Sequence, residues 1–213
     1  IRFLQMFPTL SECAVGVNSE SQEWQQLDAF MKRHPNLIGG DYSKYDQKIP
    51  AQLILAGFKI LTLLARRCNY SEEDIFVMET LAADVAYAYV MFNGDLVSYI
   101  SGSHISGNSL TVIINGLVGA LNLRCAFYHY NPDVKDYREH CCIMTYGDDN
   151  AGSYSNKVKF GIKPVHYFLA DYGQVYTMPD KESELADTLN PDDFEFLKRR
   201  TVYIPEIDCK VGA

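Results

Sequence analysis

The stretch Met144-Thr145-Tyr146-Gly147-Asp148-Asp149-Asn150 holds the side chains best suited to chemistry. The apolar residues 141–144 predict a buried strand, and Gly147 permits a tight turn that leaves two adjacent carboxylates at a hairpin tip. Neighbouring carboxylates repel each other unless a cation is present, and hard divalent cations prefer oxygen ligands. Taken alone, the pattern fits a metal site and a solvated acidic turn equally well, so the rest of the chain must decide between them.

A third carboxylate, Asp41, ends a short apolar stretch that predicts a second buried strand over residues 37–41. If this strand lies beside the hairpin, Asp41 and Asp148 can share two divalent ions. Two-metal sites hold their ions about 3.5–4 Å apart, where one activates an attacking oxygen and the other steadies a leaving oxygen. Phosphoryl transfer requires this geometry. Taken alone, Asp41 also fits an ordinary turn residue after a strand.

Composition limits the function classes. The chain has 213 residues, of which 47% are hydrophobic and 22% charged, as in a globular protein. Its net charge of −8 opposes simple, sequence-independent binding to nucleic acid. The longest mostly apolar run, residues 110–123, is too short to span a bilayer, so no transmembrane segment is predicted. The six cysteines lack metal-finger spacing and favour a reducing compartment. The chain starts without methionine, so we expect it to begin mid-domain, with no leader peptide.

Periodicity and breakers predict the elements that must position these side chains. Residues 1–20 are expected to be irregular, and Asn93-Gly94 between apolar residues predicts a two-residue hairpin. Helices are predicted over residues 22–34, 50–64, 71–89, 108–127 and 163–172, and further strands over residues 174–178 and 194–198. The elements do not alternate regularly, so we predict an α+β fold in which a small antiparallel sheet has helices on one face. His104, His129, His140 and His166 show no ligand spacing and are interpreted as structural or surface residues.

Five motifs follow one another along the chain: Asp41-xxxx-Asp46, Ser106-Gly107-xxx-Thr111-xxx-Asn115, Tyr146-Gly147-Asp148-Asp149, Asp180-Lys181 and Phe196-Leu197-Lys198-Arg199. In this order and at these spacings, the chain resembles the RNA-dependent RNA polymerase of a picorna-like positive-strand RNA virus. The resemblance covers nearly the whole chain and implies a polymerase palm, a small antiparallel sheet backed by helices, with part of the fingers.

The resemblance also implies a division of the chain. Residues 1–36 would be a remnant of the fingers that leads into the palm, and residues 49–100 a mostly helical fingers insertion. Residues 37–48 would form the palm with the first motif, and residues 101–192 the palm with the second to fourth motifs. Residues 193–213 would form the junction between palm and thumb, with the fifth motif and without the thumb.

The catalytic roles come from the same resemblance. Asp41 and Asp148 would bind two Mg²⁺ ions, for which Mn²⁺ can substitute, and Asp149 would support them. Lys181 would be the general acid for the pyrophosphate leaving group, although it also fits a solvated turn.

Nucleotide and RNA contacts are implied as well. Asp46 and Asn115 would hydrogen-bond each other and sense the ribose 2′-hydroxyl, by which proteins distinguish RNA from DNA. The other implied nucleotide-binding residues are Ser106 and Gly107 in a mobile loop, Thr111, and Arg2 at the triphosphate. Tyr146, Lys198 and Arg199 would hold the RNA primer. Ser106 also fits the N-cap of the following helix, and Asn115 an ordinary helix residue.

The implied partners are an RNA template and primer, ribonucleoside triphosphates, a protein primer and other replicase proteins. The implied location is the host cytoplasm, at membrane-associated replication sites reached through those other proteins. Two other classes stay open. One is a reverse transcriptase, which Asp46 and Asn115 oppose, and the other is a non-catalytic RNA-binding module. The isolated fragment is expected to be inactive.

Overall fold

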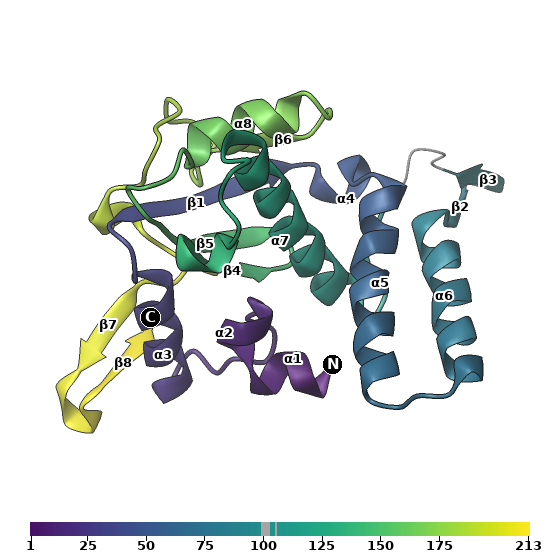
Figure 1. The fold of residues 1–213 in the computed structure, drawn as a ribbon, viewed down its shortest axis with the longest axis horizontal. Helices are drawn as coiled ribbons and strands as arrows, with labels where there is room; N and C mark the ends of the chain where they lie inside the picture. The colour runs from purple at the N-terminus through teal and green to yellow at the C-terminus, as the bar shows by residue number, and fades with distance from the viewer. Residues whose placement is uncertain (99–102, 105) are drawn as a thin grey trace.

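A central antiparallel sheet organises the molecule (Figure 1). The computed structural model describes residues 1–98, 103–104 and 106–213. The strand order in the central sheet is β4-β5-β1-β6, and each neighbouring pair is antiparallel. The strands are β1 (Asn36–Ser43), β4 (Cys141–Tyr146), β5 (Asp149–Tyr154) and β6 (Val175–Thr177). The prediction of a small antiparallel sheet combined with helices is confirmed.

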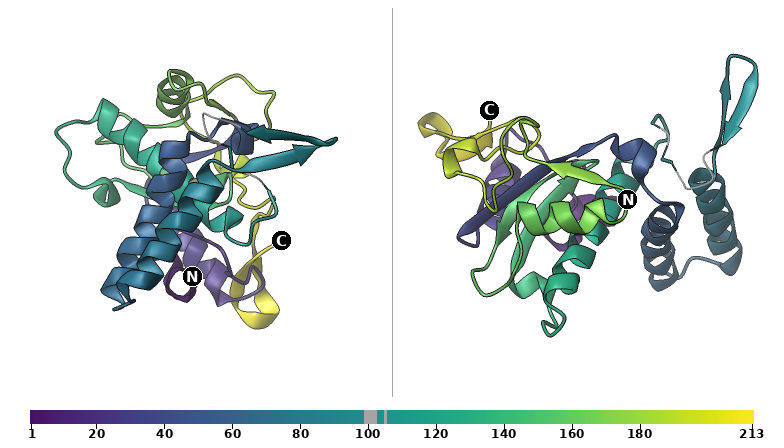
Figure 2. Two further views of the ribbon diagram at one scale, coloured as in Figure 1. Left: turned by 90° about the vertical axis from the view of Figure 1, so that its right-hand side faces the viewer. Right: turned by 90° about the horizontal axis from the view of Figure 1, so that it is seen from above.

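Helices cover this sheet on both sides. α7 (Thr111–Tyr130) and α8 (Ile162–Ala170) contact each other and the sheet, while α3 (Gln22–Met31) contacts β4 and β5. Figures 1 and 2 show α8 and α3 on opposite sides of the strands. All residues from Cys141 to Thr145 are buried, and since successive strand residues point to opposite faces, both faces are covered. The prediction of helices on only one face is therefore wrong.

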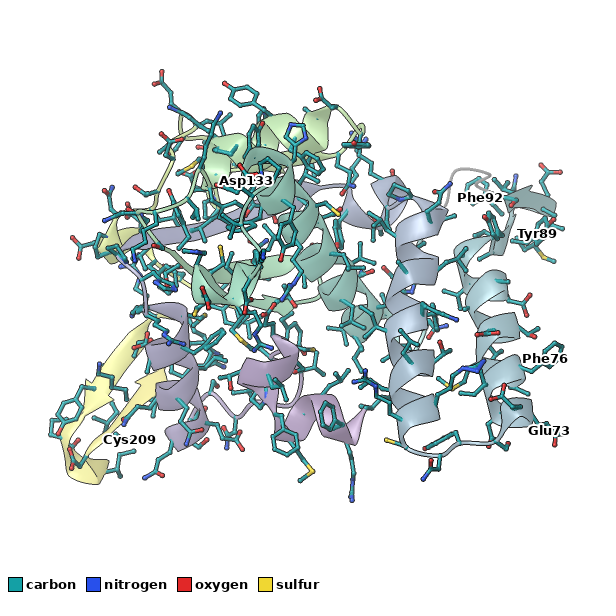
Figure 3. The ribbon with its side chains drawn as sticks, in the orientation of Figure 1. Glu73, Phe76, Tyr89, Phe92, Asp133 and Cys209 are labelled. Atoms are coloured by element: carbon teal, nitrogen blue, oxygen red, sulfur yellow. The ribbon has the colours of Figure 1, made fainter. Side chains whose placement is uncertain are left out.

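A second group of elements extends away from the sheet. α5 (Ala51–Arg67) packs against α6 (Glu72–Ala86), which is followed by the hairpin of β2 (Tyr89–Phe92) and β3 (Asp95–Ser98). Ser71 and Asp74 form a capping box at the start of α6. The Asn93-Gly94 hairpin is also confirmed, because Phe92 pairs with Asp95 across a two-residue loop. Tyr89 lies in this hairpin and not on the predicted helix, and it is exposed together with Phe76 and Phe92 (Figure 3).

The first twenty residues are more ordered than predicted. They contain α1 (Arg2–Met6) and α2 (Pro8–Ser11), followed by a short parallel pairing of Cys13 with Thr145 of β4. Thr145 donates both its backbone N–H and its hydroxyl to the Glu12 carbonyl, each at 2.9 Å. The Glu12 side chain is buried and pairs with Arg124 at 2.7 Å. These tertiary contacts order a segment whose local sequence predicts no element.

The strand predicted over residues 194–198 is wrong. Leu197 and Lys198 both have φ 56°, and Phe196 and Arg199 exchange backbone hydrogen bonds around them, so the segment is a tight turn. The strands form later, as the antiparallel pair β7 (Thr201–Ile204) and β8 (Cys209–Gly212). Phe196 is fully buried against Trp24, and this packing favours the turn over an extended strand.

The other predicted elements are confirmed with shifted ends. α7 begins at Thr111 because Asn108 accepts a side-chain hydrogen bond from the Leu110 N–H, and Ser106 is not its N-cap. α3 and α8 end three and two residues early, and α8 is followed by a turn in which Gly173 has φ 73°. Short elements complete the described residues: α4 (Tyr45–Lys48), η1 (Tyr137–Glu139), η2 (Pro191–Asp193) and η3 (Pro205–Ile207).

Helix α7 is apolar because it crosses the core. Within the described residues it alone is long and apolar enough to cross a membrane, with a mean hydropathy of 1.3 in its most apolar window. That window is 61% buried in the molecule, where α7 contacts α5, α8 and β4. These contacts account for its composition.

The hairpin of β7 and β8 is joined to α3 by buried hydrogen bonds. The indole N–H of Trp24 donates to the Thr201 hydroxyl at 3.1 Å, and that hydroxyl donates to Asp28 at 2.7 Å. Trp24 is the one tryptophan in the sequence, so its fluorescence reports on this junction.

Replacing Thr201 tests the junction. We expect Thr201→Val to lower the free energy of unfolding by about 1–3 kcal/mol, because the buried Trp24 N–H loses its acceptor and the Asp28 carboxylate loses a donor, although it keeps its ion pair with Lys32. Thr201→Ser keeps the hydroxyl and is the matched control. Denaturant unfolding followed by Trp24 fluorescence measures both variants, and equal losses would contradict the role of the hydroxyl.

Candidate functional site

The acidic hairpin forms as the sequence predicts. Tyr146 pairs with Asp149, so Gly147 and Asp148 alone make the connection between β4 and β5. Gly147 has φ 63°, a conformation that glycine adopts without steric cost. Asp148 is exposed at the tip, while Asp149 is half-buried as the first residue of β5.

Strand β1 brings Asp41 to the same place. Gly40 pairs with Asn150 of β5, so the next residue of β1, Asp41, lies level with Asp149 in the antiparallel register. Asp41 lies within β1 and not at its end, contrary to the prediction, because residues 41–43 pair with β6 on the other side. The structure thus gathers the three predicted acids at one end of the central sheet.

The electrostatics of Asp149 reflect this gathering. Burial raises the pKa of its carboxyl most, and the negative charges of Asp148 and Asp41 raise it further. The Leu197 N–H opposes the rise by donating to Asp149 Oδ2 at 2.8 Å. The tight turn at residues 196–199 therefore supplies a hydrogen bond to an acid of the hairpin.

Lys181 is the nearest cationic side chain to these acids. Its ammonium lies 2.7 Å from Asp41 Oδ2, and Asp41 followed by Asp148 raises the pKa of Lys181. The Lys181 side chain is 66% exposed, so this pair contributes little to stability. Asp41 Oδ2 is buried, and the Lys181 ammonium is its close polar partner among the described residues. A cation that binds Asp41 through this oxygen would have to share it with Lys181 or displace the ammonium.

The donor set suits a hard divalent cation, because it consists of carboxylate oxygens. Within the described ranges, no group of three or more His, Cys, Asp or Glu side chains is arranged to hold a metal ion on its own. Mg²⁺, for example, commonly takes one or two protein carboxylates and completes its shell with water and substrate phosphates. Asp41, Asp148 and Asp149, which strand pairing brings to one end of the sheet, are suited to holding a cation in this way, together with a phosphate-bearing substrate.

A buried chain of hydrogen bonds lies beside the acids. The Tyr176 hydroxyl donates to Asn150 Oδ1 at 2.7 Å, and Asn150 Nδ2 donates to the Gly40 carbonyl at 3.1 Å. It joins β6, β5 and β1 one residue from Asp149 and Asp41. A Cβ on Gly40 would lie 2.3 Å from the Tyr176 ring, so only glycine permits this packing. Asn150 directly follows the acid pair in the sequence, yet only the strand register reveals its partners.

Asp46 and Asn115 are arranged differently from the prediction that they hydrogen-bond each other. Asn115 Oδ1 lies 2.6 Å from His104 Nδ1, and no hydrogen bond joins the Asp46 and Asn115 side chains within the described part of the chain. His104 also donates its backbone N–H to the Asp46 carbonyl at 2.8 Å. The expected direct bond is therefore replaced by a link through His104, which is only 1% exposed. His104 was predicted to be a structural or surface residue, although its position two residues before Ser106-Gly107 was a usable signal.

The remaining predicted residues lie on several other elements. Ser106 and Gly107 form an exposed turn in which Gly107 has φ 100°, and Thr111 opens α7. Arg2 is exposed on α1, and Tyr146 is 36% exposed at the end of β4. Lys198 is exposed in the tight turn. Arg199 is half-buried and donates to the Gly212 carbonyl at 2.8 Å, so it also holds β8.

Comparison with known proteins relates the whole chain to viral polymerases. The family model described as viral RNA-dependent RNA polymerase matches residues 1–208. The chain is 26% identical over 209 residues to a replicase polyprotein of acute bee paralysis virus, covering 91% of this chain and 11% of the relative. It is 24% identical over 218 residues to a replicase polyprotein of Drosophila C virus, covering 95% of this chain and 12% of the relative. The chain thus spans about a tenth of the length of these relatives.

Removing the Tyr176 hydroxyl tests the hydrogen-bond chain beside the acids. We expect Tyr176→Phe to lower the free energy of unfolding by about 1–3 kcal/mol, since Asn150 keeps a buried oxygen without its donor. Tyr172→Phe changes a 64% exposed tyrosine in the same way and should have no effect. Denaturant unfolding of the two variants measures the difference, and equal stabilities would contradict the role given to Tyr176.

The pKa of Asp149 predicts a dependence of stability on pH without divalent cations. A raised pKa in the folded state means that Asp149 favours folding below its unfolded value, about 4. This contribution is lost as the pH rises through the folded value. Asp149→Asn should therefore remove part of the decline in stability above about pH 4. Denaturant unfolding at a series of pH values, with a chelator present, measures the free energy of unfolding of both proteins. If the two plots of this free energy against pH were parallel, the prediction would be contradicted.

Proposed function

This chain belongs to the viral RNA-dependent RNA polymerase family, and on that premise we propose that it holds the palm of such an enzyme with part of the fingers. In this proposal the central sheet, with residues 37–48 and 101–192, is the palm. The helices α5 and α6 with the hairpin of β2 and β3, which extend away from the sheet, are the fingers insertion (Figure 1). Residues 1–36 lead from the fingers into the palm, and residues 193–213 lie at its junction with the thumb.

The proposed reaction is RNA-directed nucleotidyl transfer. The 3′-hydroxyl of an RNA primer attacks the α-phosphate of a ribonucleoside triphosphate, and the bond to the β-phosphate breaks to release pyrophosphate. Asp41 and Asp148, supported by Asp149, would hold two Mg²⁺ ions, or Mn²⁺ in their place, which when bound would activate the hydroxyl and steady the leaving oxygen. The observation that carries this proposal is the register between β1 and β5, which sets Asp41 level with Asp149.

The chain's own side chains would position the reactants and move the protons. Lys181, held beside Asp41, is suited to giving a proton to the pyrophosphate oxygen as it leaves. Asp46 and Asn115 would recognise the ribose 2′-hydroxyl, and Ser106, Gly107 and Thr111 would contact the nucleotide. The proposed triphosphate contact is Arg2, and the proposed primer contacts are Tyr146, Lys198 and Arg199.

The proposed partners follow from the reaction. They are an RNA template and primer, ribonucleoside triphosphates, and the other proteins of a viral replicase, with a protein primer for initiation. The relatives are named as polyproteins, which supports an origin beside such proteins. We place the enzyme in the host cytoplasm, at membrane-associated replication sites reached through its partners.

The proposed function can be tested by replacing one carboxylate and, as a matched control, a second one outside the site. In the polymerase that carries this chain, we expect Asp148→Asn to reduce primer extension at least about 100-fold, since metal ligands contribute several kcal/mol to the transition state. RNA binding should be retained. Asp133→Asn changes an exposed aspartate in the loop after α7 and should leave extension unchanged (Figure 3).

The outcomes of this experiment separate the alternatives. Extension that survives Asp148→Asn would contradict the assignment of the metal ligand. Efficient incorporation of deoxynucleotides by the unmodified enzyme would favour a reverse transcriptase. RNA binding without synthesis by the unmodified enzyme would favour a non-catalytic module.

A further inference from the structure

His104 connects the segments that carry Asp46 and Asn115. Its backbone N–H donates to the Asp46 carbonyl at 2.8 Å, and its ring Nδ1 lies 2.6 Å from Asn115 Oδ1. The Ser103 hydroxyl donates to the same Asp46 carbonyl at 3.1 Å. The Asn115 backbone is held separately, because the Tyr45 hydroxyl donates to its carbonyl at 2.9 Å. The imidazole is therefore the one group among these that acts on the Asn115 side chain.

The chemistry of the contact locates the ring proton. A carbonyl oxygen can only accept a hydrogen bond, so Nδ1 of His104 must carry the hydrogen and donate it to Asn115 Oδ1. Burial lowers the pKa of His104 and so favours the neutral ring, although the hydrogen bond with Asn115 acts in the opposite direction. A neutral ring with its hydrogen on Nδ1 has none on Nε2, and Nε2 is buried with no hydrogen-bond partner in the described ranges.

This contact decides what the Asn115 amide offers to a ligand. An amide has an oxygen that accepts and a nitrogen that donates two hydrogens, and either can point toward a substrate. When His104 Nδ1–H donates to Asn115 Oδ1, a rotation of the amide by 180° would place the amide N–H groups opposite the Nδ1–H, so that two donors would face each other. The side chain is thereby held with its nitrogen available to other groups.

We propose that His104 is a positioning residue for ribose selection, which orients the Asn115 amide so that it donates to the 2′-hydroxyl of the incoming nucleotide. This inference rests on the proposed function. The hydroxyl both donates and accepts, so Asp46 would accept its hydrogen while Asn115 donates to its oxygen. A deoxynucleotide would leave both protein groups unpaired, which is how a site built for a hydroxyl rejects an analogue without one.

The test compares two amide substitutions in the polymerase that carries this chain. The nitrogen of the side chain in His104→Asn corresponds to Nδ1 and keeps a donor there, whereas that in His104→Gln corresponds to Nε2. Single-nucleotide incorporation on a defined primer and template gives kcat/KM for ATP and for 2′-deoxy-ATP. We expect His104→Gln to lower the preference for ATP about tenfold, and His104→Asn to retain most of it.

A double variant distinguishes a positioning role from a general loss of structure. With Asn115→Ala already present, His104→Gln should cause no further loss of preference, because the amide it orients is gone. Equal preferences in the two His104 variants, or equal losses for both nucleotides, would overturn this inference while leaving the proposed function in place. If the unmodified enzyme makes no RNA from ribonucleotides, the proposed function itself fails.

Discussion

Repulsion between carboxylates is the constraint on which the site depends. Asp41, Asp148 and Asp149 come from two strands and one turn. Burial raises the pKa of Asp149 most, and the charges of Asp148 and Asp41 raise it further, so ionising all three acids together has a cost. Two local contacts offset part of that cost, namely the Lys181 ammonium at Asp41 and the Leu197 N–H at Asp149. Neither contact crowds the tip of the hairpin, where Asp148 is exposed, so the acids are left open to a cation and a phosphate.

The elements around the sheet maintain this arrangement. The bonds from Tyr176 to Asn150 and from Asn150 to Gly40 hold three neighbouring strands together beside the acids. On the far edge, Glu12 accepts from Thr145 of β4, so the N-terminal segment supports the strand that leads into the hairpin. The uncommon backbone conformation at Leu197 has a similar use, because it aims an N–H at Asp149. Residues without a chemical role thus support the residues that have one.

Local signals predicted most of the elements, and they failed where distant contacts decide the conformation. The capping box at Ser71, the Asn93-Gly94 hairpin and the acidic turn depend on residues close together in sequence, so they could be predicted. The segment at residues 194–198 has apolar residues that suit a strand, but Phe196 packs on Trp24 far away in the sequence and the chain turns. The link between Asp46 and Asn115 through His104 likewise depends on how two segments meet.

The sequence by itself determined the identity and order of the five motifs, and with them the family and the acids that are candidates for metal binding. These follow from residue type and spacing, which need no coordinates. Only the tertiary structure decided that β1 pairs with β5 in the register that sets Asp41 level with Asp149. It also decided that His104 engages the Asn115 amide. Strand register and side-chain partners arise from packing between segments far apart in the chain. Residue type and spacing within one segment do not predict that packing.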